Sequence, residues 1–445
     1  MKVLLKSLFH LFVLTGLSLL MVTNAYSFDL NDAWQAAKEY DAGYRAAVHG
    51  RNAGKQKAAQ GRAQLLPQIS AGASWGSNET VKPKTSRQYE THGWRVTATQ
   101  PLFDVTKFAA YRQGKSQAKI AEKQFDYAEQ GKMVEVAQAY FELLLVHDTL
   151  DATRAAKSAY LKQLERAKTA FNVGAATAVD IDEAQANYDA AVAKEINAQS
   201  ELDIKGGTLA MLTGLNPAQI QTVDGNKVLL YGKGQDLAFL QDYALKTNPE
   251  IQAKEESLKY SQQELLGSRG NRLPKIQATG TYTDTVNNTP SSFWNPTTHL
   301  NQGYSVSIEA TIPLFAGGAL HSQTKESKSK VWQAQDELEA TRRKVREDIR
   351  KSYLGLVNGE AEVKATEQLL KSMQSKVNST KLGSEYGIRT SLDLLDAQTE
   401  YYQTIQTLAQ VRYKYLLAQL QLAQAVGILD EGVLKKTNEA VRKID

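Results

Sequence analysis

The sequence predicts a mainly α-helical protein with a small β part, built from two similar halves. Three observations carry this prediction: an internal repeat of about 200 residues, four segments in which apolar and polar residues alternate, and proline-free stretches with apolar residues every seven positions. A repeat of this length far exceeds a solenoid unit, so it indicates a duplicated half-molecule. Duplicated halves in turn suggest a pseudo-symmetric ring, tube or pore.

The repeat relates residues by a constant shift of 213 positions. Matching residues are Tyr140 and Tyr353, Gly174 and Gly387, Thr177 and Thr390, Asp180 and Asp393, and Gly214 and Gly427. The register holds without gaps for about 75 residues. We therefore expect two structural repeats, 28–214 and 236–427, joined by a connecting equatorial segment, 215–235, and followed by a C-terminal segment, 428–445.

Residues 1–27 are predicted to be a secretory signal peptide. A basic start precedes an apolar run from Leu11 to Val22, and small residues allow cleavage after Ala25 or Ser27. A retained membrane anchor is the alternative. No other segment approaches the ~20 apolar residues that a spanning helix needs, so we expect an exported chain without transmembrane helices.

The composition gives no indication of a catalytic centre. The chain has no cysteine, which excludes disulfides, thiolate metal sites and a lipid-modified N-terminus. Its six histidines are scattered, without a pair at ligand spacing, and no nucleophile motif is present. The net charge of +5 is too small to indicate nucleic acid as a partner. We therefore expect no catalytic, cofactor-binding or metal-binding residues, and no enzyme.

Alternating residues predict two β-hairpins, 67–104 and 274–315. Each segment is about ten residues long, enough for a tilted strand to cross a bilayer, and has one apolar and one polar face. Aromatic residues toward the strand ends, which would form a girdle, are Trp75, Trp94, Tyr282 and Tyr304. Polar residues expected to face a water-filled lumen are Thr97, Thr99, Ser305, Ser307 and Glu309.

Two hairpins of a soluble sandwich would show the same alternation, but export and the repeat favour a membrane barrel. Four strands cannot close such a barrel, because about eight is the smallest number that spans a bilayer. A barrel therefore demands several copies of the chain. The polar stretches Ser77–Thr91 and Asp284–Gln302 are expected to be outward-facing loops.

Almost all remaining residues are expected to be helical, with one helix before each hairpin and long helices at 105–171, 176–213, 317–385 and 390–427. The longest would extend roughly 100 Å at 1.5 Å per residue. Apolar residues recur at steps of seven, with one step of four, at Val331, Leu338, Val345, Ile349, Leu356, Val363, Leu370 and Val377. Sustained sevens indicate a coiled coil, and helices this long must stand side by side as a bundle, a rod or the wall of a tube.

A sharp turn reverses the chain between the long helices of each half. The tip residues are Val173, Gly174, Ala175, Tyr386, Gly387 and Ile388. Glycine allows the reversal, and Thr177 or Ser391 can cap the helix that follows.

Carboxylates follow each turn at a spacing of three residues. Asp393 and Asp396 share one helix face, as do Asp180 and Glu183 in the first half. In an assembly with an axis, such acids become rings that favour cations. The alternative is a solvated first helical turn, where acids suit the positive end of the helix dipole.

The tip segments resemble those of the TolC family of outer-membrane export channels. The likeness rests on Gly387–Gln398, its weaker copy Gly174–Gln185, and the strand entries Leu66-Pro67 and Leu273-Pro274. It implies that three chains form one twelve-stranded barrel in the outer membrane of a Gram-negative bacterium, with a hollow helical barrel across the periplasm. It also implies export of proteins by type I secretion, or of small toxic compounds and drugs, together with a periplasmic adaptor and an inner-membrane transporter of ABC or RND type.

The resemblance also implies roles for single residues. Asp393 and Asp396 match positions that line the periplasmic constriction, whereas Arg389 and Asp180 match a latch that holds the closed end. Ser384 stands where the family has a latch tyrosine. The two glycine-centred turns match the family's adaptor-contacting tips, with Ala175 and Ile388 in place of the more usual residues. The predicted aperture residues are Asp180, Glu183, Arg389, Asp393 and Asp396.

Two other classes of protein share some of these features. A periplasmic adaptor also carries a coiled-coil hairpin, but it needs one hairpin flanked by small β domains, whereas this chain has two hairpins and strands of bilayer length. A structural coiled-coil protein of an envelope complex is the second class, and urea would extract it from membranes.

Overall fold

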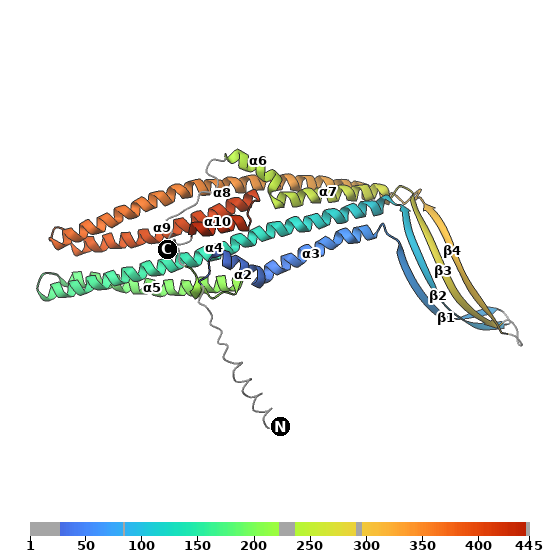
Figure 1. The fold of residues 1–445 in the computed structure, drawn as a ribbon, viewed down its shortest axis with the longest axis horizontal. Helices are drawn as coiled ribbons and strands as arrows, with labels where there is room; N and C mark the ends of the chain where they lie inside the picture. The colour runs from blue at the N-terminus through green and yellow to red at the C-terminus, as the bar shows by residue number, and fades with distance from the viewer. Residues whose placement is uncertain (1–26, 83–84, 222–235, 291–295, 442–445) are drawn as a thin grey trace, which may run out of the picture.

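The computed structural model describes residues 27–82, 85–221, 236–290 and 296–441. The predicted signal peptide, apart from Ser27, and most of the connecting segment lie outside these ranges. The chain is elongated, with a four-stranded sheet at one end and the turns of two long helical hairpins at the other (Figure 1). The predicted fold class, mainly helical with a small β part, is confirmed.

Each half contributes two short helices, a β-hairpin and a pair of long helices. In the first half these are α2 (Leu30–Tyr40), α3 (Ala42–Ala63), β1 (Gln68–Lys82), β2 (Thr85–Phe103), α4 (Val105–Asn172) and α5 (Ala178–Thr213). In the second half they are α6 (Leu237–Thr247), α7 (Pro249–Gly270), β3 (Lys275–Pro290), β4 (Pro296–Thr311), α8 (Ala319–Glu385) and α9 (Ser391–Val426). A 3₁₀ turn, η1 (Pro217–Gln219), follows the first half, and α10 (Glu431–Val441) follows the second.

The sequence predicts one helix before each hairpin, and the structure has two. Asp41 takes an extended conformation, and its Oδ1 accepts the amide of Tyr44 at 2.5 Å to begin α3. Asn248 likewise accepts the amide of Glu250 at 2.9 Å to begin α7. Pro249 has no N–H to continue the preceding helix, but it fits the first position of a new one. Capping side chains therefore divide the helical segment before each hairpin into two helices. The spacing of apolar residues alone does not predict this break.

The four strands form one antiparallel sheet in the order β1-β2-β3-β4. They are longer than predicted, because the described parts of the polar stretches Ser77–Thr91 and Asp284–Gln302 are strand. Their side chains bond across strands: Asn78 Nδ2 donates to Thr91 Oγ1 at 3.2 Å, and Gln302 Nε2 donates to Asp284 Oδ2 at 3.0 Å. The prediction of loops is therefore wrong for these residues. Polar side chains indicate contact with water, but they do not prevent the backbone from pairing with a neighbouring strand.

The register separates the two faces of the sheet. One row of paired residues is polar across all four strands: Ser70, Thr97, Thr281 and Ser305. The next row is apolar: Ala71, Val96, Tyr282 and Tyr304. Since paired residues share a face and successive residues alternate, one face is polar and the other apolar. The rings of Trp94 and Tyr282 lie 5.1 Å apart, beside the point where Asp284 interrupts the apolar face.

Apolar side chains of the long helices fill two main clusters. In the second half, five residues predicted at steps of seven and four are buried in a cluster with residues of α6, α7 and α9: Leu338, Val345, Ile349, Leu356 and Val363. The other cluster joins α2, α4, α5, α9 and α10, and includes Trp34, Tyr140 and Leu434. The seven-residue spacing thus predicts the packed face of α8. Helix α9 contributes buried residues to both clusters.

Candidate functional site at the helical tips

Both hairpin turns have the same backbone structure. Gly174 and Gly387 have positive φ angles of 77° and 70°. The residue after each glycine donates its amide into the last helical turn: Ile388 N bonds to Gly383 O at 2.8 Å, and Ala175 makes the matching bond in the first turn. This Schellman ending needs a residue in the left-handed region, which favours glycine at the reversal.

All six predicted tip residues are exposed at the end of the molecule opposite the sheet (Figure 1). Three of them are large and apolar: Val173, Tyr386 and Ile388 are 75%, 79% and 80% exposed. Apolar side chains gathered at a surface reversal are typical of contact sites for other proteins. The tips therefore offer a surface for a partner.

The first carboxylate after each turn completes a helix cap. Thr390 Oγ1 accepts the amide of Asp393 at 3.1 Å, and Asp393 Oδ2 accepts the amide of Thr390 at 2.9 Å. Thr177 and Asp180 make the same reciprocal pair in the first half. These pairs are capping boxes. The expectation that Ser391 caps α9 is wrong, because Thr390 occupies the cap one residue earlier.

The caps lower the pKa of both carboxyl groups. Backbone and side-chain hydrogen bonds from Thr177 lower the pKa of Asp180. The same bonds from Thr390, together with the positive charge of Arg389, lower the pKa of Asp393. Both groups are therefore charged at neutral pH. The acids of the first helical turn stabilise their helices and at the same time place negative charge at the tips.

The other predicted aperture residues lie close to the same reversals. Asp396 and Arg389 are exposed, and Glu183 is partly buried. Within the described ranges no ion pair joins Arg389 to Asp180 or Asp393, although its charge acts on Asp393. The structure thus gathers the acids at the tips and leaves the predicted latch contact unmade within one chain.

Removal of the second cap should destabilise that tip by about 1 kcal/mol. Thr390→Ala deletes the hydroxyl that bonds Asp393 and shifts the carboxyl pKa back toward its ordinary value. Since the folded pKa is lowered, the stabilisation is present above the ordinary pKa of Asp and is lost as pH falls through the lowered value. The difference in thermal unfolding between the variant and the parent should therefore be largest at neutral pH and shrink in acid, where only the bond from the Asp393 amide to Thr390 Oγ1 still favours the parent. Thr390→Ser keeps the hydroxyl and serves as the control; an equal loss there, or a gap constant with pH, would contradict the cap.

A seam of hydrogen bonds joins the two hairpins along α4 and α9. The three side-chain pairs are Asp148 with Tyr413 (2.7 Å), Thr153 with Gln406 (3.2 Å) and Tyr160 with Thr399 (2.9 Å). The spacing of apolar residues does not predict this seam, because the side chains that form it are polar or hydrogen-bonded. The available signal is the spacing of seven between Thr399, Gln406 and Tyr413.

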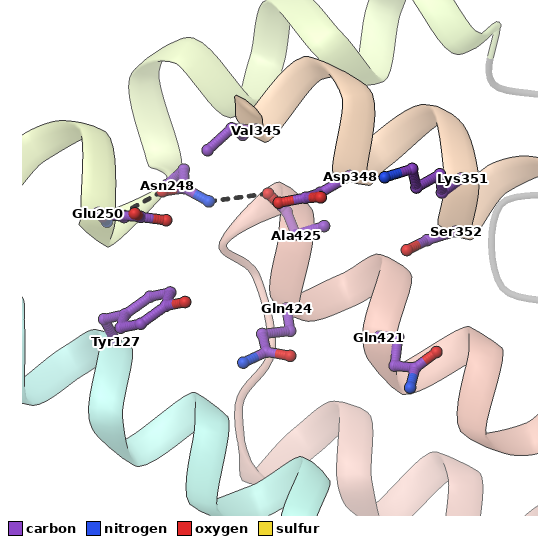
Figure 2. A pocket seen from close by; sticks show the side chains of 10 residues that line it. All are labelled: Tyr127, Asn248, Glu250, Val345, Asp348, Lys351, Ser352, Gln421, Gln424 and Ala425. Atoms are coloured by element: carbon purple, nitrogen blue, oxygen red, sulfur yellow. Dashed lines mark hydrogen bonds between the residues drawn. The ribbon is translucent and has the colours of Figure 1, made fainter. Parts of the chain in front are cut away.

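A pocket of about 300 Å³ lies at mid-length, where α4, α7, α8 and α9 meet (Figure 2). Its lining consists of Tyr127, Asn248, Glu250, Val345, Asp348, Lys351, Ser352, Gln421, Gln424 and Ala425. Asn248 Nδ2 donates to the carbonyl of Ala425 at 2.8 Å and so closes one wall. The lining contains no histidine that could serve Ser352 as a base. The pocket is lined by polar and charged side chains, and it lies between Tyr127 of the first half and residues of the second half.

The described ranges contain no group of three or more His, Cys, Asp or Glu side chains placed to hold a metal ion. They also contain no helix that is both long enough and apolar enough to span a membrane.

Three known proteins are similar to this chain along most of its length. The alkaline protease secretion protein AprF of Pseudomonas aeruginosa is 29% identical over 430 residues, which cover 94% of this chain and 88% of AprF. The outer membrane protein TolC of Vibrio cholerae is 28% identical over 438 residues, which cover 98% of this chain and 99% of TolC. The solved CmeC outer membrane channel of Campylobacter jejuni has the same fold, with a TM-score of 0.77 at 16% identity, covering 93% of this chain and 89% of CmeC.

One protein family matches the chain in two blocks, residues 34–215 and 240–428, and is described as outer membrane efflux protein. The blocks coincide with the two halves of the fold, each with its hairpin of strands and its pair of long helices. Together they cover well over half of the sequence. The chain therefore belongs to the outer membrane efflux protein family.

Proposed function

We propose that the protein is an export channel of the outer membrane, which carries proteins, small toxic compounds or drugs from the periplasmic end to the exterior. Membership of the outer membrane efflux family supports both the role and the location. The observation that supports it most is a sheet with one polar and one apolar face, neither covered by a described helix. Val306 and Ile308 on the apolar face are 78% and 71% exposed. Such a face is stable in lipid.

Three copies would close the sheet into a twelve-stranded barrel. Within the described chain, β1 and β4 are edge strands with no neighbour on their outer side. A sheet in a membrane must close, because unpaired backbone groups are too costly in hydrocarbon. The long helices of the same copies would then stand side by side as a hollow tube that crosses the periplasm and ends at the tips.

The tips are proposed to receive a periplasmic adaptor, with an inner-membrane transporter of ABC or RND type as the source of energy. The apolar side chains of Val173, Tyr386 and Ile388 would supply the contact. The name of AprF, a protease secretion protein, favours protein as cargo through type I secretion. Within this role the protein performs no chemistry of its own.

The acids near the reversals would ring the periplasmic aperture. In a threefold assembly, Asp393 and Asp396 become rings of negative charge, and Asp180 and Glu183 add a second pair. Docking at the tips would splay the second hairpin, separate Arg389 from acids of a neighbouring copy, and widen the aperture.

Asp393→Asn combined with Asp396→Asn tests the aperture. The double variant should lower the cation-over-anion permeability ratio several-fold in planar-bilayer recordings, because two carboxylates per copy lose their charge. Because Asp393 has a lowered pKa, its part of the selectivity should persist in acid where a free aspartate is neutral. Asp182→Asn is the matched control, since this exposed acid lies near the other tip on a different helix face from Glu183. Unchanged selectivity in the double variant would remove these residues from the aperture.

A further inference from the structure

Helices α4 and α8 both begin beside the sheet, shortly after the strands β2 and β4 end (Figure 1). Exposed apolar side chains mark both junctions. Leu314 and Phe315 are 91% and 88% exposed, and Leu102 and Phe103 are exposed as well. The first turns of both helices therefore lie next to the part of the chain that is proposed to contact lipid.

Aromatic rings and cations share one face of α4 in its first turns. Four residues follow one another there at helical spacings of three and four: Phe108, Tyr111, Arg112 and Lys115. The guanidinium carbon of Arg112 lies 4.7 Å from the ring centre of Phe108, and Lys115 Nζ lies 5.7 Å from that of Tyr111. Because helical side chains lean toward the N-terminus of their helix, each cation reaches back by one turn toward the sheet.

The first turns of α8 carry the same chemistry. At the shift of 213, Arg112 and Lys115 correspond to Lys325 and Lys328. Trp332 is 54% exposed, and its ring centre lies 4.8 Å from Lys328 Nζ. Two helices of every copy thus present a pair of cations beside exposed aromatic rings. These four cations, with the rings next to them, are the basic belt.

The four cations of the belt form no ion pair within the described ranges. Lys330, in the same part of α8, pairs with Glu264 at 2.7 Å and with Glu326 at 2.9 Å. The surrounding chain is also basic: residues 42–63 contain five Lys or Arg and residues 105–119 contain four, without an Asp or Glu in either range. Uncompensated positive charge of this kind attracts an anionic partner.

The neighbours of α4 leave it two free faces within the chain. A Cβ added at Gly114 would come within 2.4 Å of a carbonyl oxygen of α3, and one added at Gly270 of α7 within 2.9 Å of an α4 side chain, so both helices pack closely against α4. One free face carries the belt. The other, two residues from Lys115 in either direction, carries Gln113 and Gln117. Uncharged amides suit a water-filled lumen, whereas rings beside cations suit a boundary between hydrocarbon and water.

We propose that the basic belt binds the phosphate groups of anionic phospholipids at the periplasmic surface of the outer membrane, and so fixes the depth at which the channel sits. This inference rests on the proposed channel, whose strands cross the membrane and whose helices leave it on the periplasmic side. The exposed apolar residues at the junctions would meet hydrocarbon, the aromatic rings the interface, and the cations the phosphate layer.

The height of the cations fits this layer. Arg112 follows the first residue of α4 by seven positions, which is roughly 10 Å at 1.5 Å per residue. Its guanidinium returns toward Phe108 by one turn, or roughly 5 Å. The headgroup region extends by a similar distance, roughly 5–7 Å, beyond the hydrocarbon core. A cell-wall polymer would also offer carboxylates, but it would not account for the exposed Leu314 and Phe315.

Removal of the belt charges tests the proposal. Arg112→Gln, Lys115→Gln, Lys325→Gln and Lys328→Gln are combined in the full-length protein. Native mass spectrometry of the detergent-solubilised protein counts the lipids bound after phosphatidylglycerol or phosphatidylcholine is added. The parent should prefer phosphatidylglycerol by roughly fivefold or more, the factor that one cation near an anionic surface contributes. The quadruple variant should bind the two lipids equally.

The matched control removes four exposed cations from the same two helices, far from the sheet: Lys162→Gln, Lys168→Gln, Lys371→Gln and Lys381→Gln. This variant should keep the preference of the parent. Equal preference in the parent and the belt variant, or an equal loss in the control, would overturn the belt. If the quadruple variant loses the assembly of the parent, which the same spectrum reports as mass, Arg112→Gln with Lys115→Gln should still lower the preference, and an unchanged preference there would also overturn it.

Two further measurements identify the partner. Excess glycerol phosphate, a headgroup without chains, should leave the bound phosphatidylglycerol in place, and complete displacement would mean that the surface holds free phosphate and not a membrane. Binding to purified cell-wall sacculi by the parent and not by the belt variant, without any lipid preference, would assign the surface to the cell wall.

The lipid count does not require a conducting protein. A protein that conducts in a planar bilayer but shows no lipid preference would overturn the belt and leave the proposed channel in place. A protein that prefers phosphatidylglycerol through the belt but gives no current would support the belt and count against the proposed channel.

Discussion

Val306→Arg should abolish stable insertion of the protein into membranes. Val306 lies between Tyr304 and Ile308 on the apolar face of β4, and its side chain is 78% exposed. Arginine at the midplane of a bilayer costs about 2–4 kcal/mol, and a threefold assembly carries that cost in every copy. We expect the fraction that folds into lipid vesicles, followed by resistance to protease and to unfolding in SDS, to fall sharply.

The next residue provides the matched control. Ser307 is also exposed, but it pairs with Thr279 in a polar row on the opposite face. Ser307→Arg adds the same side chain at nearly the same depth, so insertion should be retained and only ion selectivity should change. Equal loss of insertion in both variants would contradict the assignment of faces. Equal retention would mean that the apolar face does not meet lipid.

Features with local causes are predictable from this sequence. Leu338, Val345 and Leu356 select one face of α8 by their spacing, whatever covers that face, and the structure buries all three. Gly174 and Gly387 mark the reversals because other residues adopt a positive φ only with strain. The period of two along the strands likewise separates the faces of the sheet before any partner is known.

Features that depend on a distant partner are not predictable in this way. In the sequence, nothing distinguishes Tyr413 from the other aromatic residues of its helix. Its hydrogen bond to Asp148 forms only because α9 lies against α4. The polarity of Ser77–Thr91 indicates water, but not that its backbone pairs with a neighbouring strand. The candidate site shows the same limit. The spacing of Asp393 and Asp396 fixes a shared helix face, whereas a ring of charge requires more copies than one.

Trp34→Ala should lower the free energy of unfolding by about 3–5 kcal/mol. Trp34 is fully buried, its ring meets that of Tyr44 edge to face at 5.6 Å, and its Nε1 donates to Glu431 Oε1 at 3.2 Å. One side chain therefore joins α2, α3 and α10, and alanine leaves a cavity where the three helices meet. Urea unfolding followed by far-ultraviolet circular dichroism measures the loss.

Trp34→Phe separates the packing from the hydrogen bond. Phenylalanine keeps a smaller aromatic ring and loses the bond to Glu431, whose carboxylate still accepts Lys38 Nζ at 2.6 Å. This variant should lose about 1 kcal/mol. Equal losses in both variants would mean that the bond, and not the packing, attaches α10. If neither variant lowered the free energy of unfolding, α10 would not unfold together with the rest of the chain. That result would contradict the structure, in which Asn438 Oδ1 accepts the amide of Leu30 at 3.1 Å.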